Sequence, residues 1–508
     1  AIFIAAYLIM VWPLTAVRIV DAFTSILNDE QVSYADVIRS SVYIFTLAIQ
    51  TVAIYWSGSR GPWLGLAIGA FALILILLVS LRNATAEGRF KAGDFGRALG
   101  LTVGAIVAGG GVLFLLVRLL AGSGRLQALA GPGTWLVAFL GGAAIAAIAI
   151  LVLMAAGRGW RWLWMSWLLL AVLAIGWVAL FNLAPPPAEA ADSPVPTAVL
   201  ETVDAWRQIP NVGRFGRLLE AESGTGRVRV LIWEGVLDLL APHEPLAFPD
   251  GEEDPFNFLR PLLGYGPESM YVAYNGFYVP ELATLEARNA SPDRSHNETF
   301  DTLVITGALG FLAWQVLYVS VFYYGFRWLG VVRSARDRNV LILLWVVGAI
   351  VGAVIITSAL GLPYIGVAIP FGSIGGLVLY LVYYARFTQT TVEASANPFQ
   401  GDRLLLLGLL AAIIAHYVEI NFGIAIASTR VHFFVYVALM FLVGHLLPRL
   451  SAVDAEARAS APPAQRRRAR RAAPVRESGW LGPVLAVSII LALVVGTLGY
   501  DFMNYTRP

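Results

Sequence analysis

The stretch Ser295-His296-Asn297-Glu298 stands directly before a long apolar run that begins at about residue 301. Ser295 and Glu298 have the spacing of a capping box, in which a serine and a glutamate three residues later satisfy the first free N–H groups of a helix. The sequence therefore predicts a helix that begins here, with His296 and Asn297 in its first turn. Free N–H groups and the positive end of the helix dipole would surround the imidazole and favour its neutral form.

Two glycines of the same predicted helix, Gly307 and Gly310, lie near the face that carries His296. At ~100° per residue, Gly307 falls about 20° round the helix from His296, and Gly310 falls about 40° the other way. Small residues at such spacing let membrane helices pack closely. We therefore expect this face to contact protein and to direct His296 into a protein-lined opening. A single histidine at a helix start is more often a cap or a surface residue than a catalyst, so other features must support a catalytic role.

The composition is that of a polytopic membrane protein. Of the 508 residues, 58% are hydrophobic and 13% are charged, and the mean hydropathy is +0.72; soluble domains are far less apolar. The chain has no cysteine, which excludes disulfides, thiolate zinc sites and iron–sulfur clusters. It opens at Ala1 inside an apolar run, without a basic region or a cleavage site. We therefore expect a start part-way through a longer protein, not a signal peptide.

Apolar stretches long enough to cross a membrane, ~20 residues, recur along the chain. They predict an all-α polytopic membrane protein of about twelve transmembrane helices with one large extracytoplasmic helical loop segment. The predicted spans are 1–20, 41–58, 62–81, 99–120, 134–156, 163–183, 301–326, 340–360, 366–385, 404–422, 430–447 and 479–500. The predicted domains are N-terminal transmembrane helices (1–183), an extracytoplasmic soluble segment (184–300), further transmembrane helices (301–447), a basic cytoplasmic linker (448–478), and a last helix with an outer C-terminus (479–508).

The placement of arginine predicts the orientation, because cytoplasmic loops of membrane proteins are rich in Lys and Arg. Basic residues gather in the loops 82–98, 157–162, 327–339 and 448–478. The predicted spans place all four loops on one side, taken as cytoplasmic, and the acidic connection 21–40 shares that side. We interpret the basic run of the last loop as a topology signal in a linker, so no nucleic-acid partner is expected.

Residues 184–300 are the predicted outer segment, in which acidic residues outnumber basic ones by 18 to 8. Helices are predicted at 199–206 and from Arg227 to Leu240. In the second helix Arg229 lies one turn before Trp233, a spacing that allows a cation–π pair. The acidic loop at 250–255 lacks the ligand spacing of a calcium site, so no metal is expected. Helical spacing in the second helix predicts an apolar face of Val230, Trp233, Leu237 and Leu240.

Cations on the same predicted side are candidates for an anion site. Arg60, in the turn Ser59-Arg60-Gly61, would start a helix, where a guanidinium and free N–H groups suit a phosphate; the alternative is contact with lipid headgroups. Arg229, or its neighbour Arg227, is the second cation, and the alternative is a local ion pair with Glu220 or Glu222. One imidazole base with two guanidiniums suits transfer from a phosphate-activated donor, with the base accepting a hydroxyl proton and the cations holding the leaving diphosphate.

Two further ionisable residues, His416 and Glu419, lie near the outer end of the predicted span 404–422. Ionisable groups within a membrane segment are candidates for function. A buried polar pair that fixes helix packing is an equal alternative.

These residues together resemble the O-antigen ligase and O-antigen polymerase superfamily. His296-Asn297, nine residues and then Gly307-x-x-Gly310 match its H-[NSQ]-x9-G-x-x-[GTY] signature, and Ser59-Arg60-Gly61 resembles its SRG turn. Arg229-x-x-x-Trp233, followed by the stretch that runs from Pro261 through Gly264-Tyr265-Gly266 to Glu268, resembles its R-x-x-x-W … P-x-x-G-x-G loop.

The resemblance implies a metal-independent, integral-membrane C-class glycosyltransferase of the cell inner membrane, without a cofactor. Such enzymes move a glycan from a polyprenyl diphosphate to an acceptor hydroxyl on the outer face of the cytoplasmic membrane. By resemblance His296 is the base and Arg60 and Arg229 contact the diphosphate. The acceptor stays open among a lipid, a growing polysaccharide and a protein, as in ligases, polymerases and protein O-oligosaccharyltransferases. A transporter or flippase of lipid-linked glycans is the more distant alternative; it predicts inverted repeats and polar residues near the bilayer midplane.

Overall fold

The computed structural model describes residues 2–28, 34–81, 161–186, 195–208, 213, 216, 224–247, 251–287, 290–388 and 401–460. These residues form helices joined by turns, with an isolated β-bridge between Ala247 and Glu253. Eight of the helices are long and apolar enough to cross a membrane, so the chain is an α-helical polytopic membrane protein. The eight are α1 (Ile2–Asn28), α2 (Tyr34–Trp56), α3 (Arg60–Leu81), α6 (Arg161–Leu183), α12 (Glu298–Trp328), α13 (Ala335–Leu360), α14 (Ile365–Phe387) with its preceding turn η6 (Leu362–Tyr364), and α16 (Ala427–Phe441) continued by η8 (Leu442–Leu446) into α17 (Leu447–Ser460).

A further helix, α15 (Gly401–Glu419), lies at the centre of the bundle, against α1 and α3. It coincides with the predicted span 404–422, and residues 406–421 are all buried. A helix that is apolar all round is one enclosed by other elements. The predicted spans 99–120, 134–156 and 479–500 lie outside the described residues, so the number twelve stays a prediction.

Glycines set the close approach of α3 and α15. An added Cβ would lie 2.9 Å from the Ala415 carbonyl oxygen at Gly65 and 2.7 Å from Ala415 Cβ at Gly69. Gly61, Gly65 and Gly69 recur every fourth residue, which is the small-xxx-small pattern of tightly packed membrane helices. The pattern therefore brings the start of α3, with Arg60, against the end of α15. Gly348, Gly352, Gly372 and Gly376 give α13 and α14 the same kind of contact.

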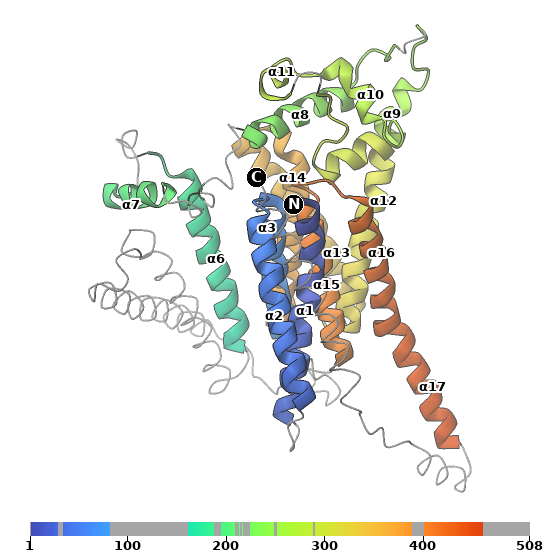
Figure 1. The fold of residues 1–508 in the computed structure, drawn as a ribbon. Coiled ribbons are helices and arrows are strands. Elements are labelled where there is room, and N and C mark those ends of the chain that lie inside the picture. The colour runs from blue at the N-terminus through green and yellow to red at the C-terminus, as the bar shows by residue number, and fades with distance from the viewer. Residues whose placement is uncertain are drawn as a thin grey trace, which may run out of the picture.

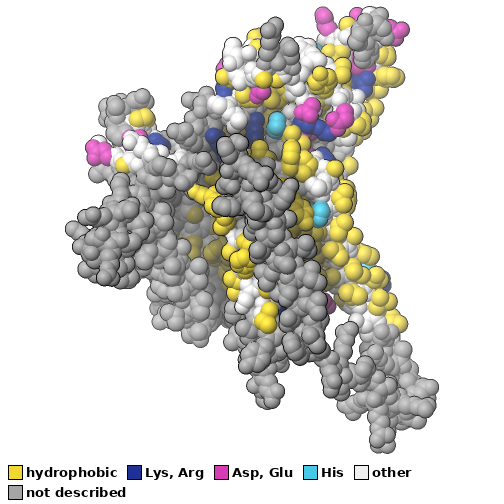
Figure 2. Space-filling view, in the orientation of Figure 1, with side chains coloured by type: hydrophobic (Ala, Val, Ile, Leu, Met, Phe, Trp, Pro, Cys, Tyr) yellow, Lys and Arg dark blue, Asp and Glu magenta, His cyan; other side chains and the backbone are white. Residues whose placement is uncertain are grey.

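Residues 224–297, which we call the loop segment, cover one end of the bundle, and α17 lies at the opposite end (Figure 1). The loop segment contains α8 (Gly224–Leu240), η4 (Asn257–Leu259), α9 (Arg260–Leu263), α10 (Met270–Ala273), η5 (Tyr274–Phe277) and α11 (Leu282–Leu285). Figure 2 shows acidic side chains over this end, whereas the side of the bundle over α16 is hydrophobic. The helices predicted at 199–206 and 227–240 are confirmed as α7 (Thr197–Arg207) and α8.

The loop segment packs on the bundle through its own apolar core. Trp233 of α8, Phe300 of α12 and Val367 of α14 are all buried in this core. The predicted apolar face of α8 is correct for Val230 and Trp233, but Leu237 and Leu240 are only partly buried, and Val236 and Leu239 are buried instead. The buried face is thus turned by about one residue from the predicted one, because the loop segment and α12 enclose the helix from two directions.

The predicted capping box at the start of α12 is wrong. The helix begins at Glu298, and its N-cap is Asn297, whose side chain accepts a hydrogen bond from the Phe300 N–H at 3.1 Å. Asparagine is as good an N-cap as serine, so the helix starts two residues later than predicted. His296 therefore precedes the helix and does not belong to its first turn. Ser295 and Glu298 are free to bond elsewhere.

A second correction concerns Gly307, which interrupts α12. Its backbone, with φ 65° and ψ −169°, is not helical, and this region is essentially open to glycine alone. The helical-wheel relation predicted between His296 and Gly307 is therefore wrong, since no regular helix joins them. The expectation that Gly307 contacts protein is confirmed: an added Cβ would lie 2.3 Å from the backbone carbon of Leu262.

The break at Gly307 provides the docking point for the loop segment. Val304 and Ile305 lie within one turn before the break, so their carbonyls are freed from regular helical bonding. The Val304 carbonyl accepts a hydrogen bond from the Tyr265 N–H at 2.7 Å, and the Ile305 carbonyl accepts one from the Gly266 N–H at 3.0 Å. The turn Gly264-Tyr265-Gly266 and the stretch of α12 before Gly307, which belong to two different sequence motifs, therefore contact each other directly.

Candidate functional site

His296 has a strained backbone. Its φ is 57°, in the left-handed region, and Glu268 is the other non-glycine residue with positive φ among those that the structure describes. Such conformations persist only where the surroundings enforce them, and they gather at functional sites.

Hydrogen bonds on both sides of His296 enforce this conformation. Before it, the Ser295 N–H donates to Asp301 Oδ1 at 2.7 Å, and the Ser295 carbonyl accepts from Trp233 Nε1 at 2.9 Å. After it, Asn297 Nδ2 donates to the Asn421 carbonyl at 3.0 Å. Ser295 and Asn297 are both fully buried. The backbone on either side of His296 is thus held by α8, by α12 and by Asn421, which follows α15.

The imidazole itself stays available. Burial, and then the positive charge of Arg229, lower the pKa of His296, while Asp293 partly opposes the shift. Within the described part of the chain, neither the His296 nor the Arg229 side chain forms a hydrogen bond or an ion pair. A neutral imidazole with an unused nitrogen lone pair is what a proton acceptor requires. The predicted neutral form therefore has a different cause: burial and Arg229, not a position inside the first helical turn.

Arg229 also has Arg60 as an electrostatic neighbour. Burial, and then the charge of Arg60, lower the pKa of Arg229, and the carboxylate of Glu419 opposes the shift. Arg60 starts α3, and an added Cβ on the adjacent Gly61 would lie 3.6 Å from the Glu419 carbonyl oxygen. The structure thus brings Arg60, Arg229 and His296 to the same end of the bundle.

Glu419 is part of this group, and His416 lies apart from it. Glu419 is 1% exposed at the end of α15, and its Oε2 atom has no hydrogen-bond partner among the described residues. His416, one turn earlier, is equally buried, and its ring lies 6.1 Å from that of Phe433 on α16. Both side chains are buried, as the alternative of a buried polar pair expects, and no hydrogen bond joins them; whether they fix helix packing stays a prediction.

Arg227 lies outside the group. Its guanidinium pairs with both carboxylate oxygens of Glu281, at 2.7 and 2.9 Å, within the loop segment. The predicted partners Glu220 and Glu222 lie outside the described residues. Of the two neighbouring arginines, Arg229 is thus the one that the structure leaves for a ligand.

The predicted cation–π pair of Arg229 and Trp233 is not formed. The Trp233 ring lies 6.2 Å from Phe300 and 5.9 Å from Tyr364, and its N–H supports the backbone before His296. The role of the tryptophan is therefore to join α8 to the histidine.

Two other predicted residues support the site through the backbone. Ser59 precedes α3, and its carbonyl accepts a hydrogen bond from the Trp63 N–H at 3.4 Å. Tyr265 bonds α12 through its N–H, whereas its hydroxyl lies 2.9 Å from His243 Nε2 in the loop segment. The Tyr265 ring therefore belongs to a different part of the molecule from His296.

Sequence reasoning missed the contacts that hold the start of α12 to the rest of the bundle. Glu298 is buried and pairs with Arg430 at 2.9 Å, and Thr299 donates to Asn421 Oδ1 at 3.1 Å. These partners are more than 120 residues apart in the chain. No local pattern could have joined them, although a glutamate and an arginine within apolar segments were a visible signal.

Among the residues described, no three His, Asp or Glu side chains lie close enough together to hold a metal ion. Independence from metal nevertheless stays a prediction. Comparison of the chain with family models, with curated proteins and with solved structures found no match.

Proposed function

We propose that the chain is an integral-membrane glycosyltransferase that moves a glycan from a polyprenyl diphosphate to an acceptor hydroxyl on the outer face of the cytoplasmic membrane. The observation that carries the proposal is the position of Arg229 between the other two residues: its charge, after burial, lowers the pKa of His296, and the charge of Arg60, after burial, lowers the pKa of Arg229. A proton acceptor beside two cations is the arrangement that such a transfer needs. The three residues lie in the three sequence motifs that resemble the O-antigen ligase superfamily.

In this proposal the neutral His296 accepts the proton of the acceptor hydroxyl. The hydroxyl oxygen forms a new bond to the anomeric carbon of the donor sugar, and the bond from that carbon to the phosphate oxygen breaks. The polyprenyl diphosphate departs with the electron pair of the broken bond, and Arg60 and Arg229 stabilise its negative charge. Backside displacement of this kind inverts the anomeric centre.

The alternatives within the superfamily are an O-antigen or capsule polymerase and a protein O-oligosaccharyltransferase. They share the donor and the chemistry and differ in the acceptor. A transporter or flippase is less well supported, because the candidate residues gather at the end of the bundle under the loop segment and not along its length.

Purified protein in lipid nanodiscs, given a labelled polyprenyl-diphosphate glycan, tests the proposal against a panel of lipid, polysaccharide and peptide acceptors. We expect wild-type protein to transfer the label to one acceptor class and His296→Ala to lower kcat far more than donor affinity, since a base acts mainly in the transition state. Arg227→Ala is the matched control and should keep its activity. Transfer that His296→Ala leaves unchanged, or protein that moves the donor across a bilayer without any transfer, would overturn the proposal.

A further inference from the structure

We propose that the loop segment carries a second site, a pocket that binds a neutral or amino-sugar oligosaccharide. It is separate from His296, and it deepens the proposed function, because a sugar chain held there would belong to the donor or the acceptor glycan.

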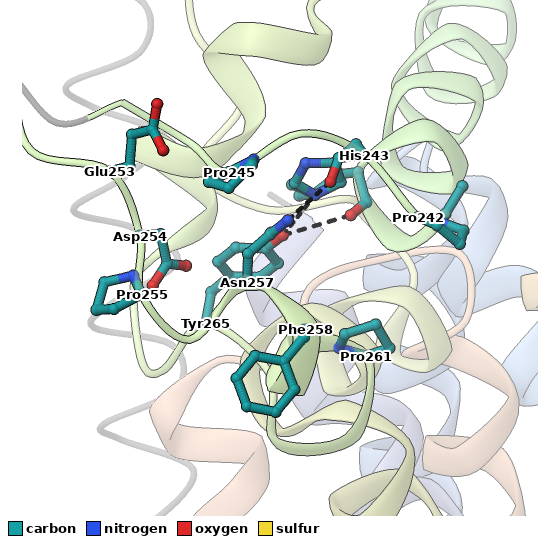
Figure 3. Close-up of a pocket in the computed structure, with 12 residues that line it drawn as sticks. Pro242, His243, Pro245, Glu253, Asp254, Pro255, Asn257, Phe258, Pro261 and Tyr265 are labelled. Carbon is teal, nitrogen blue, oxygen red and sulfur yellow. Dashed lines mark hydrogen bonds between the residues drawn. The ribbon is translucent and has the colours of Figure 1, made fainter.

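The pocket is a cavity of about 720 Å³ between the end of α8, the turn that follows it and the residues 253–265. This volume is that of sites for drug-sized ligands, enough for roughly two or three sugar rings. Figure 3 shows Asn257 near its centre, with Phe258 and Pro261 to one side and Glu253 and Pro245 to the other. Polar and flat apolar groups thus face one space, as in sites that bind the edges and the faces of sugar rings.

The polar groups of the pocket offer hydrogen-bond acceptors. Asn257 Nδ2 donates to the His243 carbonyl at 2.7 Å, which orients the amide of this lining residue. The Glu253 side chain is exposed in the same lining, and its carboxylate forms no hydrogen bond or ion pair within the described part of the chain. The carboxylate can therefore accept hydrogen bonds from ligand hydroxyl or amino groups.

The charges select the class of sugar. Arg260 belongs to the same stretch of chain, and its guanidinium donates to both carboxylate oxygens of Asp254, at 2.7 and 2.9 Å. The residues that line the pocket include no lysine or arginine. An acidic sugar would therefore find no counter-ion there and would meet the charge of Glu253, whereas hydroxyl and amino groups can donate to the acceptors.

An exposed aromatic ring stands beside these acceptors. The Phe258 side chain is 77% exposed, although large apolar side chains are costly in water. Pro261 lies next to it in the same lining. Flat apolar surfaces of this kind are suited to the C–H faces of sugar rings.

Hydrogen bonds of Tyr265 connect the pocket to α12, the helix that follows His296. Tyr265 lines the pocket, and its hydroxyl forms a hydrogen bond with His243 Nε2. The histidine tautomer decides which of the two groups donates. The backbone of the same tyrosine bonds Val304 of α12 at 2.7 Å. A glycan in the pocket would therefore lie at a fixed distance from the site of transfer. The pocket could then bind one part of a glycan while the site acts on another part of it.

The test is direct binding, measured by saturation-transfer NMR on the full chain in nanodiscs without donor or turnover. The probes are maltotetraose, tetra-N-acetylchitotetraose, a glucosamine tetramer and tetragalacturonate. We expect binding of a neutral or amino-sugar probe and none of the acidic one. Phe258→Ala should weaken binding about tenfold, the upper range for one aromatic contact. Glu253→Gln should weaken binding of the glucosamine tetramer and leave binding of the neutral probes unchanged.

Tyr271→Ala is the matched control, because this aromatic residue is 57% exposed on the same segment and lies outside the pocket. Its binding should equal that of wild type, and His296→Ala should also retain binding. No binding of any probe, equal binding of tetragalacturonate, or equal effects of Phe258→Ala and Tyr271→Ala would overturn the pocket. Because binding is read without transfer, a protein that binds sugars as expected but transfers none would refute the proposed function alone, and the reverse result would refute the pocket alone.

Discussion

Substitution of Gly307 by alanine tests how the loop segment is attached to α12. A residue with a side chain in this backbone region costs about 1–3 kcal/mol. The new Cβ would also lie 2.3 Å from the Leu262 backbone carbon, and backbone cannot move aside as a side chain can. We expect the turn to shift away and the hydrogen bonds of Tyr265 and Gly266 to α12 to be lost, at about 1 kcal/mol each. The contact should weaken by roughly 3–5 kcal/mol in total.

Hydrogen exchange read by mass spectrometry measures this weakening locally. The Tyr265 and Gly266 amides are protected by the Val304 and Ile305 carbonyls, so peptides that cover them should exchange on the order of 100-fold faster in Gly307→Ala, as about 3 kcal/mol implies. The bundle peptides should keep their protection. Exchange at the wild-type rate in these two amides would refute the account of the break in α12.

Gly375→Ala is the matched control. Gly375 lies in the helix α14 and an added Cβ meets nothing within 4 Å, so the variant should exchange as wild type does and gain a few tenths of a kcal/mol to about 1 kcal/mol in helix propensity. Gly264→Ala is the complementary test, because its Cβ would lie 2.4 Å from the Ile305 backbone carbon. Both substitutions break the same contact, so the destabilisation of the contact in the double variant should be smaller than the sum of the two single destabilisations.

Trp233→Phe should lower the free energy of unfolding in mixed micelles by about 1–3 kcal/mol, because it leaves the buried Ser295 carbonyl without its donor; unchanged stability would contradict that role. The pH profile of kcat/KM should have its acidic limb below pH 6.5, since burial and Arg229 lower the pKa of His296 and activity is lost only when the imidazole gains a proton; Arg229→Ala should move the limb upward, and a limb that stays in place would exclude the charge as a cause. Because the chain has no cysteine, Glu252→Cys gives a single label; labelling of intact cells from outside is expected, and protection until lysis would reverse the predicted topology.

The helices of the fold were largely predictable, because long apolar runs and the periodicity of α8 are local signals. Details that depend on competition between neighbours were not. Ser295 looked like an N-cap by its spacing with Glu298, but Asn297 is as good a cap, and Glu298 is stabilised by Arg430 in another helix. The sequence pattern correctly indicated that a helix starts near residue 297. It did not identify the N-cap residue, because the Glu298 side chain pairs with Arg430 and does not close a capping box.

The sequence indicated which residues are candidates for the site, but not how they are arranged in space. Spacing and resemblance selected His296, Arg60 and Arg229, yet the reason for their proximity lies in contacts that no stretch of sequence displays. The repeat of Gly61, Gly65 and Gly69 was the one visible signal for the approach of α3 to α15. The left-handed backbone of His296 had no signal, because two of the residues that hold it, Trp233 and Asn421, are distant in the chain.

Binding of a polyprenyl diphosphate without a glycan tests most directly whether Arg60 and Arg229 form one anion site beside His296. Affinity should be measured by calorimetry in nanodiscs for wild type, Arg60→Ala, Arg229→Ala and the ion-paired control Arg227→Ala. Loss of a charge-assisted contact predicts binding at least about tenfold weaker in the first two variants and nearly unchanged in the control. If Arg227→Ala weakens binding as much as Arg229→Ala does, or if neither Arg60→Ala nor Arg229→Ala changes it, the shared site does not exist.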